Sequence, residues 1–163
     1  MNIKQWIVFC ILFISIILSA CKPTVLSGEP EIKSSFTITT LTNQDFESIN
    51  AEGFEKDDFR KVDFLLEVNN SESIENRSIS VPDFTLVMNS YDIERYWFGQ
   101  YTISDSPGRN ALYSNNIMFL SRDLSNDEIR SVFKDEKIVI TWTNKNGEEK
   151  ENIIHLTDII SFE

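Results

Sequence analysis

The sequence predicts an all-β fold, an antiparallel β-sandwich of about seven strands with one short helix. Short runs of apolar residues alternate with polar ones, and turn-forming residues separate these runs at modest spacing. One stretch carries clear start signals of a helix. Because no internal repeat or low-complexity tract interrupts the pattern, residues 32–163 are expected to form a single sandwich domain.

The first two expected strands show the alternation most clearly. From Ile32, the apolar residues Phe36 and Ile38 share one parity while polar residues take the other, as in a half-buried strand. Residues 43–58 are polar and are expected to form a loop or a short irregular helix. Residues 60–69 then alternate in the same way and predict the second strand.

The next stretch is expected to contain a turn and the third strand. Residues 69–80 are turn-like, and Phe84, Leu86 and Met88 alternate after Pro82. Proline is tolerated at the first residue of a strand because its missing N–H is not needed there. The pattern therefore predicts a strand that begins after this proline.

The fourth and fifth strands flank a strong turn signal. Residues 94–102 are aromatic on both parities and predict a strand, and residues 104–110 contain Asp-Ser-Pro-Gly. Tyr113 and the apolar run at 117–120 predict the strand that follows.

The single predicted helix spans residues 126–134. Ser125 and Glu128 fit a capping box, and the flanking Leu124 and Ile129 fit a hydrophobic staple. The acidic residues fall at its start and the basic ones later, as the helix dipole prefers.

A hairpin is expected from residues 137–143 and 149–156, around the Asn-Gly pair at 146–147. A two-residue turn would place Ile140 opposite Ile153, and a longer turn would shift the register by one residue. The apolar tail that follows is expected to pack on the domain. These elements predict an immunoglobulin-like architecture, although the Cys–Trp–Cys pattern of antibody domains is absent.

The N-terminus has the marks of a secretory signal, since Lys4 precedes an apolar run at residues 7–18. Residues 6–20 would make a helix of about 22 Å, too short to cross a hydrocarbon core of about 30 Å. The run ends in Leu18-Ser19-Ala20-Cys21, which resembles the lipobox of bacterial lipoproteins. This resemblance is limited to residues 1–21.

The resemblance implies that residues 1–20 are a signal peptide removed before Cys21, and that a diacylglycerol is attached to the Cys21 thiol. Acyl chains such as palmitate would hold the protein in the cell envelope, on the extracytoplasmic face of a bacterial membrane. Residues 21–31 contain Pro and Gly without apolar periodicity and are expected to form a flexible tether.

The net charge argues against nucleic acid and anionic lipid surfaces as partners, and the cysteine content argues against a disulfide bond. The chain has a net charge of −11, and removal of residues 1–20 takes away only Lys4, which leaves 14 basic against 26 acidic residues. Nucleic acid and anionic lipid surfaces would be repelled, whereas cationic partners would not. With Cys10 in the signal and Cys21 acylated, no disulfide is expected.

No catalytic or metal site is expected, and the lipid is the only attached group. His155 is the single histidine, zinc would require more suitable ligands, and no G-x-S-x-G motif is present. Two carboxylate groups, at 57–58 and at 123–128, are candidate calcium ligands. Solvation explains the first group more simply and helix capping the second.

Aromatic residues and arginines concentrate between residues 91 and 113, and Tyr, Trp and Arg dominate binding hot spots. The candidate partner-binding residues are Tyr91, Arg95, Tyr96, Trp97, Tyr101, Arg109 and Tyr113. The alternative is that these aromatics belong to a central strand buried on both faces.

These observations together predict a membrane-anchored lipoprotein with a non-enzymatic binding domain, whose partner is an envelope or extracellular protein. Two alternatives are an immunity or inhibitor lipoprotein that binds a cationic protein, and an envelope hydrolase.

Overall fold

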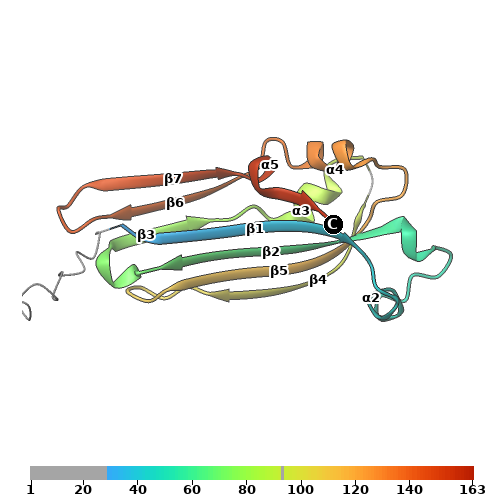
Figure 1. Cartoon of the computed structure of the whole chain (residues 1–163), viewed down its shortest axis with the longest axis horizontal. Coiled ribbons are helices and arrows are strands. Elements are labelled where there is room, and N and C mark those ends of the chain that lie inside the picture. The colour runs from blue at the N-terminus through green and yellow to red at the C-terminus, as the bar shows by residue number, and fades with distance from the viewer. Residues whose placement is uncertain (1–28, 93) are drawn as a thin grey trace, which may run out of the picture.

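The computed structural model describes residues 29–92 and 94–163, which form two stacked β-sheets with short helices gathered at one end (Figure 1). The larger sheet has the strand order β4-β5-β2-β1-β8 and the smaller one β3-β6-β7. The strands are β1 (Glu31–Thr40), β2 (Phe59–Asn69), β3 (Glu75–Ser80), β4 (Tyr96–Ser104), β5 (Ala111–Leu120), β6 (Lys137–Thr143), β7 (Glu149–His155) and β8 (Ile160–Phe162). The helices are α2 (Asn43–Ser48), α3 (Phe84–Asn89), α4 (Asn126–Val132) and α5 (Leu156–Ile159), with two 3-10 turns at Lys56–Asp58 and Ser71–Ser73.

The main core lies between the two sheets and follows the predicted alternation. Phe36 and Ile38 of β1 are fully buried, and β1 pairs with β2 along its whole length. The same face of β2 buries Val62, Phe64, Leu66 and Val68. The two predicted strands are therefore confirmed, because period-two burial is what one covered sheet face requires.

Aromatic side chains close the end of the sandwich where the helices gather. Phe36 makes edge-on contacts with Phe84 of α3 and with Phe133, which follows α4, at ring-centroid distances of 5.5 and 5.0 Å. Phe84 also contacts Phe64 at 5.2 Å. Helix α3 and the residue after α4 thus cover the middle of β1 and β2 on the inner face of the larger sheet.

The predicted helix is confirmed as α4. The Ser125 side chain accepts a hydrogen bond from the Glu128 backbone N–H, and the Glu128 carboxylate accepts one from the Ser125 N–H at 2.8 Å. The helix ends at Val132, two residues before the predicted end. Ile129 is buried in the main core, and Leu124 packs against that core.

The predicted hairpin is confirmed, with the register shifted by one residue. Val139 pairs with Ile153, so Ile140 faces Asn152 and the two-residue turn is wrong. Asn144 and Glu148 close a three-residue loop in which Gly147 has φ +78°, a left-handed conformation that suits glycine.

The third strand, predicted from Phe84, Leu86 and Met88, is wrong, because this stretch forms the helix α3. The Asp83 side chain accepts hydrogen bonds from the Thr85 and Leu86 backbone N–H groups and so caps the helix. Phe84, Val87 and Met88 then share one buried face at helical spacing, while Leu86 is 68% exposed.

The stretch at 69–80 was expected to be a turn, but it ends in the strand β3. Ile79 is the one apolar residue of this strand, so the strand depends on pairing with β6 rather than on its own pattern. The prediction that the tail packs on the domain is confirmed, since α5 leads to β8, Phe36 pairs with Ile160 in parallel and Ile160 belongs to the main core. In residues 29–92 and 94–163 the fold is a sandwich-like, mainly β structure with eight strands in place of about seven and several short helices in place of one.

The signal peptide at 1–20, Cys21 and most of the expected tether at 21–31 lie outside the described residues. The last tether residue, Glu31, already belongs to β1. In the described part of the chain, no helix has both the length and the apolar character needed to cross a membrane.

Candidate functional site

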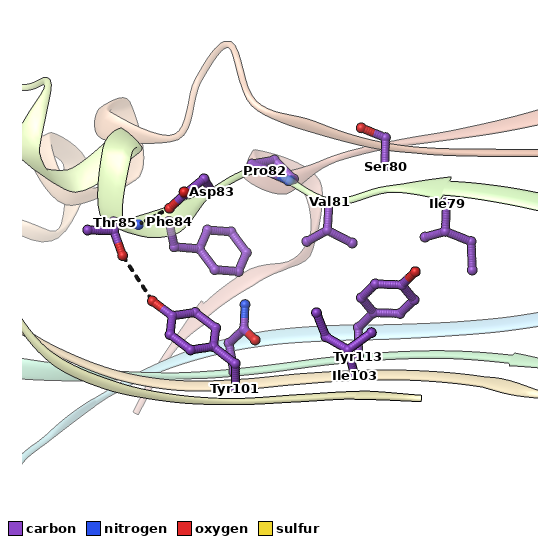
Figure 2. Close-up of a pocket in the computed structure, with 11 residues that line it drawn as sticks. Ile79, Ser80, Val81, Pro82, Asp83, Phe84, Thr85, Tyr101, Ile103 and Tyr113 are labelled. Carbon is purple, nitrogen blue, oxygen red and sulfur yellow. Dashed lines mark hydrogen bonds between the residues drawn. The ribbon is translucent and has the colours of Figure 1, made fainter. Parts of the chain in front are cut away.

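A groove of about 600 Å³ opens between the edges of the two sheets, where the segment from β3 to α3 lies opposite β4 and β5 (Figure 2). One wall consists of Ile79, Val81, Pro82 and the start of α3, and the other of side chains from β4 and β5. Its lining residues are Ile79, Ser80, Val81, Pro82, Asp83, Phe84, Thr85, Tyr101, Ile103, Tyr113 and Asn115. We call this feature the β3/β4 groove.

The strand pairing explains why apolar side chains of β4 remain uncovered. Tyr101 pairs with Asn115 and Ile103 with Tyr113, on the sheet face that points toward the smaller sheet. The smaller sheet ends at β3, so Tyr101 is 48% and Ile103 64% exposed. These two residues have the orientation of core residues without a covering strand.

One end of the groove is closed by hydroxyl groups. The Tyr101 hydroxyl lies 2.9 Å from Thr85 Oγ1 and 3.4 Å from the Tyr96 hydroxyl. Burial and the hydrogen bond with Tyr101 raise the pKa of Tyr96 to about 12. Gly99 makes room for this arrangement, because a Cβ there would lie 2.8 Å from the Tyr96 hydroxyl.

An arginine lies beyond the other end of the groove, next to Tyr113 but outside the lining residues. Arg77 of β3 is almost fully buried and forms an ion pair with Asp105, in the turn after β4. It also donates to the Arg109 carbonyl oxygen at 2.6 Å, which ties β3 to the β4–β5 turn. Tyr113 donates to Asp105 at 2.7 Å, and burial together with this bond raises the pKa of Tyr113 to about 12.

The free edge of β4 borders the groove. Because β4 ends the order of its sheet, one row of its backbone N–H and C=O groups has no partner strand in the described residues. Sheet edges in proteins are usually protected by charged residues or proline. The nine residues of β4, Tyr-Trp-Phe-Gly-Gln-Tyr-Thr-Ile-Ser, contain neither.

A β-bulge at the start of β4 explains its aromatic residues on both parities. Tyr96 pairs with Phe119 and Phe98 with Met118, so Trp97 is the extra residue. Tyr96 packs on the main core, whereas Trp97 packs on a second cluster with Phe59, on the opposite face of the larger sheet. At this end, β4 therefore contributes side chains to both hydrophobic clusters.

The structure brings together three of the seven predicted binding residues, since Tyr96, Tyr101 and Tyr113 share the inner face of β4 and β5. Arg95 is buried, where it forms an ion pair with Asp92 and donates to the Leu120 carbonyl oxygen at 3.0 Å. The Asp92 carboxylate raises the pKa of Arg95. The donors of this guanidinium are therefore used to hold the chain before β4.

The remaining predicted residues lie outside the groove lining. Tyr91 and Arg109 are exposed, and Trp97 donates its ring N–H to the Ile49 carbonyl oxygen at 3.0 Å.

Sequence analysis missed Ile103 and the wall formed by Val81 and Thr85. Ile103 continues the apolar parity of Tyr101, which was the available signal. Val81 and Thr85 had no signal, because their place in the groove depends on α3 being a helix.

One member of each predicted carboxylate group has a structural partner. Asp58 forms an ion pair with Arg122, whose hydrogen bond lowers the pKa of the carboxyl. Glu128 is held in the α4 cap, and hydrogen bonds from Ser125 lower its pKa. His155 is exposed opposite Lys137. Among residues 29–92 and 94–163, no three His, Cys, Asp or Glu side chains are arranged to hold a metal ion.

No family model matches the chain, and no curated protein matches it either. The geometry of the β3/β4 groove is therefore the basis of the function proposed below.

Proposed function

We propose that this protein is a lipid-anchored, non-enzymatic binding protein of the bacterial envelope, and that it holds a partner protein in the β3/β4 groove. The anchor is proposed from the Leu-Ser-Ala-Cys sequence at 18–21, with diacylglycerol on Cys21 and residues 22–30 as the tether. The domain would then stand on the extracytoplasmic face of the membrane.

The observation that supports binding is the uncovered inner face of β4. Tyr101 and Ile103 point toward the smaller sheet without a covering strand, beside an apolar groove of about 600 Å³. Exposed apolar surface rimmed by polar groups is typical of interaction sites. Tyrosines also favour binding, because a large rigid ring loses little conformational entropy when it is covered.

We also propose that the sandwich is of immunoglobulin-like type, and the strand order supports this. Strands β1-β2-β5-β4 follow the order A-B-E-D, and β3-β6-β7 follow C-F-G, as in a constant-type domain. Strand β8 is an addition next to β1. In this architecture the open side lies between strands C and D, which is where the β3/β4 groove is found.

A second candidate, an immunity or inhibitor lipoprotein, is favoured by charge. The chain carries 26 acidic against 15 basic residues, so a cationic protein would be attracted at long range. Both candidates use the same groove and differ in whether the partner is a resident envelope protein or a secreted cationic one.

The anchor is tested by Cys21→Ser in the native host. We expect the wild-type protein to sediment with membranes and to carry a mass increment on Cys21 after loss of residues 1–20, and the variant to be unacylated and to keep residues 1–20. An unmodified Cys21 on wild-type protein that is free in the medium would contradict the anchor.

The groove is tested by placing a photo-crosslinking amino acid at position 103 or, as a control, at position 153 in intact cells. Ile153 is also an exposed isoleucine of an edge strand, but it lies on β7 in the other sheet. We expect a discrete protein adduct from position 103 and none from position 153. Equal adducts from both positions, or none from either, would reject the groove as the binding site.

A further inference from the structure

Strand β4 combines a free edge with a groove on the inner side of that edge. An extended peptide can add to such an edge through main-chain hydrogen bonds, while its alternate side chains enter pockets. Of the four strands that end the two sheets, β3 and β7 carry charged residues and β8 has only three residues. Strand β4 has nine residues and no charge.

The dimensions of the groove fit an added strand. A strand beside β4 would lie about 4.8 Å away, with side chains on one face repeating about every 7 Å. Tyr101 at one end of the groove and Asp105 beyond its other end are four residues apart on the β4 side, which is about 13 Å. Two inward side chains of the added strand would therefore lie between them, against Val81 and Ile103.

We infer that β4 binds an extended cationic segment of another protein by strand addition, with the apolar side chains of that segment inserted in the β3/β4 groove. This inference rests on the proposed function and specifies the chemistry of the partner. The backbone of β4 would provide affinity and the groove would select apolar residues at alternate positions.

Charge selects the cationic segment over other occupants. None of the residues that line the groove is basic, the nearby Arg77 is paired with Asp105, and Asp83 lies exposed at the rim. A second copy of this chain would bring the same net charge of −11, and its own β4 has no basic residue to offset the repulsion. A segment that alternates basic and apolar residues meets both requirements.

The test uses the full-length lipidated protein in neutral detergent and three fluorescent nine-residue peptides. The first alternates lysine and valine, the second alternates glutamate and valine, and the third is the lysine peptide with every backbone amide methylated. Binding is measured by anisotropy for the wild type, Ile103→Lys and Ile153→Lys. Both variants gain one positive charge, so their difference isolates the groove.

We expect the lysine peptide to bind at least about tenfold more tightly than either other peptide. Ile103→Lys should weaken its binding by about tenfold or more, and Ile153→Lys should change it by less than about threefold. Hydrogen exchange at the β4 amides should slow in the complex, with no change at the β7 amides.

Equal binding of the methylated peptide, or unchanged exchange at β4, would overturn strand addition. Equal binding of the glutamate peptide would overturn the cationic partner. Self-association that Ile103→Lys abolishes would identify a second copy as the occupant and also overturn the inference. If position 103 still crosslinks to a protein in cells while these tests fail, the proposed function stands and only the strand-addition inference is lost.

Discussion

The two long edge strands that end different sheets, β4 and β7, differ in how they meet solvent. Strand β7 presents Glu149, Lys150 and Glu151, and Lys150 forms an ion pair with Glu148 at 2.9 Å. Strand β4 is longer, uncharged and bordered by an apolar groove. Charges on an edge strand oppose pairing with another chain, because an incoming strand would have to desolvate them. The difference indicates that the protein protects one edge and leaves the other available.

The largest expected effect is a loss of stability on the β4 side of the molecule, caused by removing a core side chain beneath the groove. Phe84 is fully buried and contacts both Phe36 and Phe64. Phe84→Ala should lower the free energy of unfolding by about 3–5 kcal/mol, since it leaves a cavity in the core beneath the groove. Urea denaturation measures this loss. Leu86→Ala on the same helix is the control and should cost less than about 0.5 kcal/mol, because Leu86 is exposed.

A smaller loss is expected on the β7 side from Asn144→Ala. The Asn144 side chain is buried and accepts hydrogen bonds from the Asn146 and Glu148 backbone N–H groups, at 2.9 and 3.0 Å. Its removal should cost about 1–2 kcal/mol by leaving these donors without their acceptor. Denaturation should show this loss while crosslinking at position 103 is unchanged. A loss of crosslinking would mean that the two sides of the molecule are coupled.

Alkaline pH should act on the groove through its tyrosines. The raised pKa of about 12 for Tyr96 and Tyr113 means that the unfolded state releases these protons first, near pH 10. Stability should therefore be full below about pH 10 and fall as the pH rises toward 12, by about 1 kcal/mol at about pH 11 after solvent screening.

Thermal denaturation across this range measures the alkaline effect, and absorbance of the tyrosinate form follows the titration. The control is Tyr96→Phe with Tyr113→Phe, in which the slope of stability against pH should be shallower. An unchanged slope in this double variant would contradict the assignment.

The smallest expected effect is on the stability of the two lysine variants used in the binding test. Ile103→Lys and Ile153→Lys replace exposed side chains, so each should change the free energy of unfolding by less than about 0.5 kcal/mol. Chemical denaturation of both variants checks this. A large loss for Ile103→Lys alone would show that Ile103 belongs to the core rather than to a binding surface.

Some elements could be predicted because their signal is local. The alternation at 60–69 fixes which face of β2 is buried, and the capping box at Ser125 and Glu128 fixes where α4 begins. In both cases residues two to four apart determine the outcome. The stretch at 84–89 was ambiguous, since Phe84 and Met88 fit a strand and a helix equally well. Its packing against Phe36 and Phe64 favours the helix.

The candidate site could be predicted only in part. The aromatic run of β4 is visible in the sequence, and Tyr96 and Tyr101 were identified from it. The opposite wall of the groove comes from the segment between β3 and α3, and the residues of α3 were predicted to form a strand. Arg77, which pairs with Asp105 beside the groove, lies 28 residues before it in a strand with little apolar pattern.

The sequence by itself determined the alternating strands, the capped helix and the excess of acidic charge, because each follows from residues close together in the chain or from their total number. Only the tertiary structure decided which strands end the sheets and which core-facing side chains stay uncovered. Those properties depend on which strands lie next to each other in space. The local pattern of residues in a strand does not show whether a neighbouring strand is present.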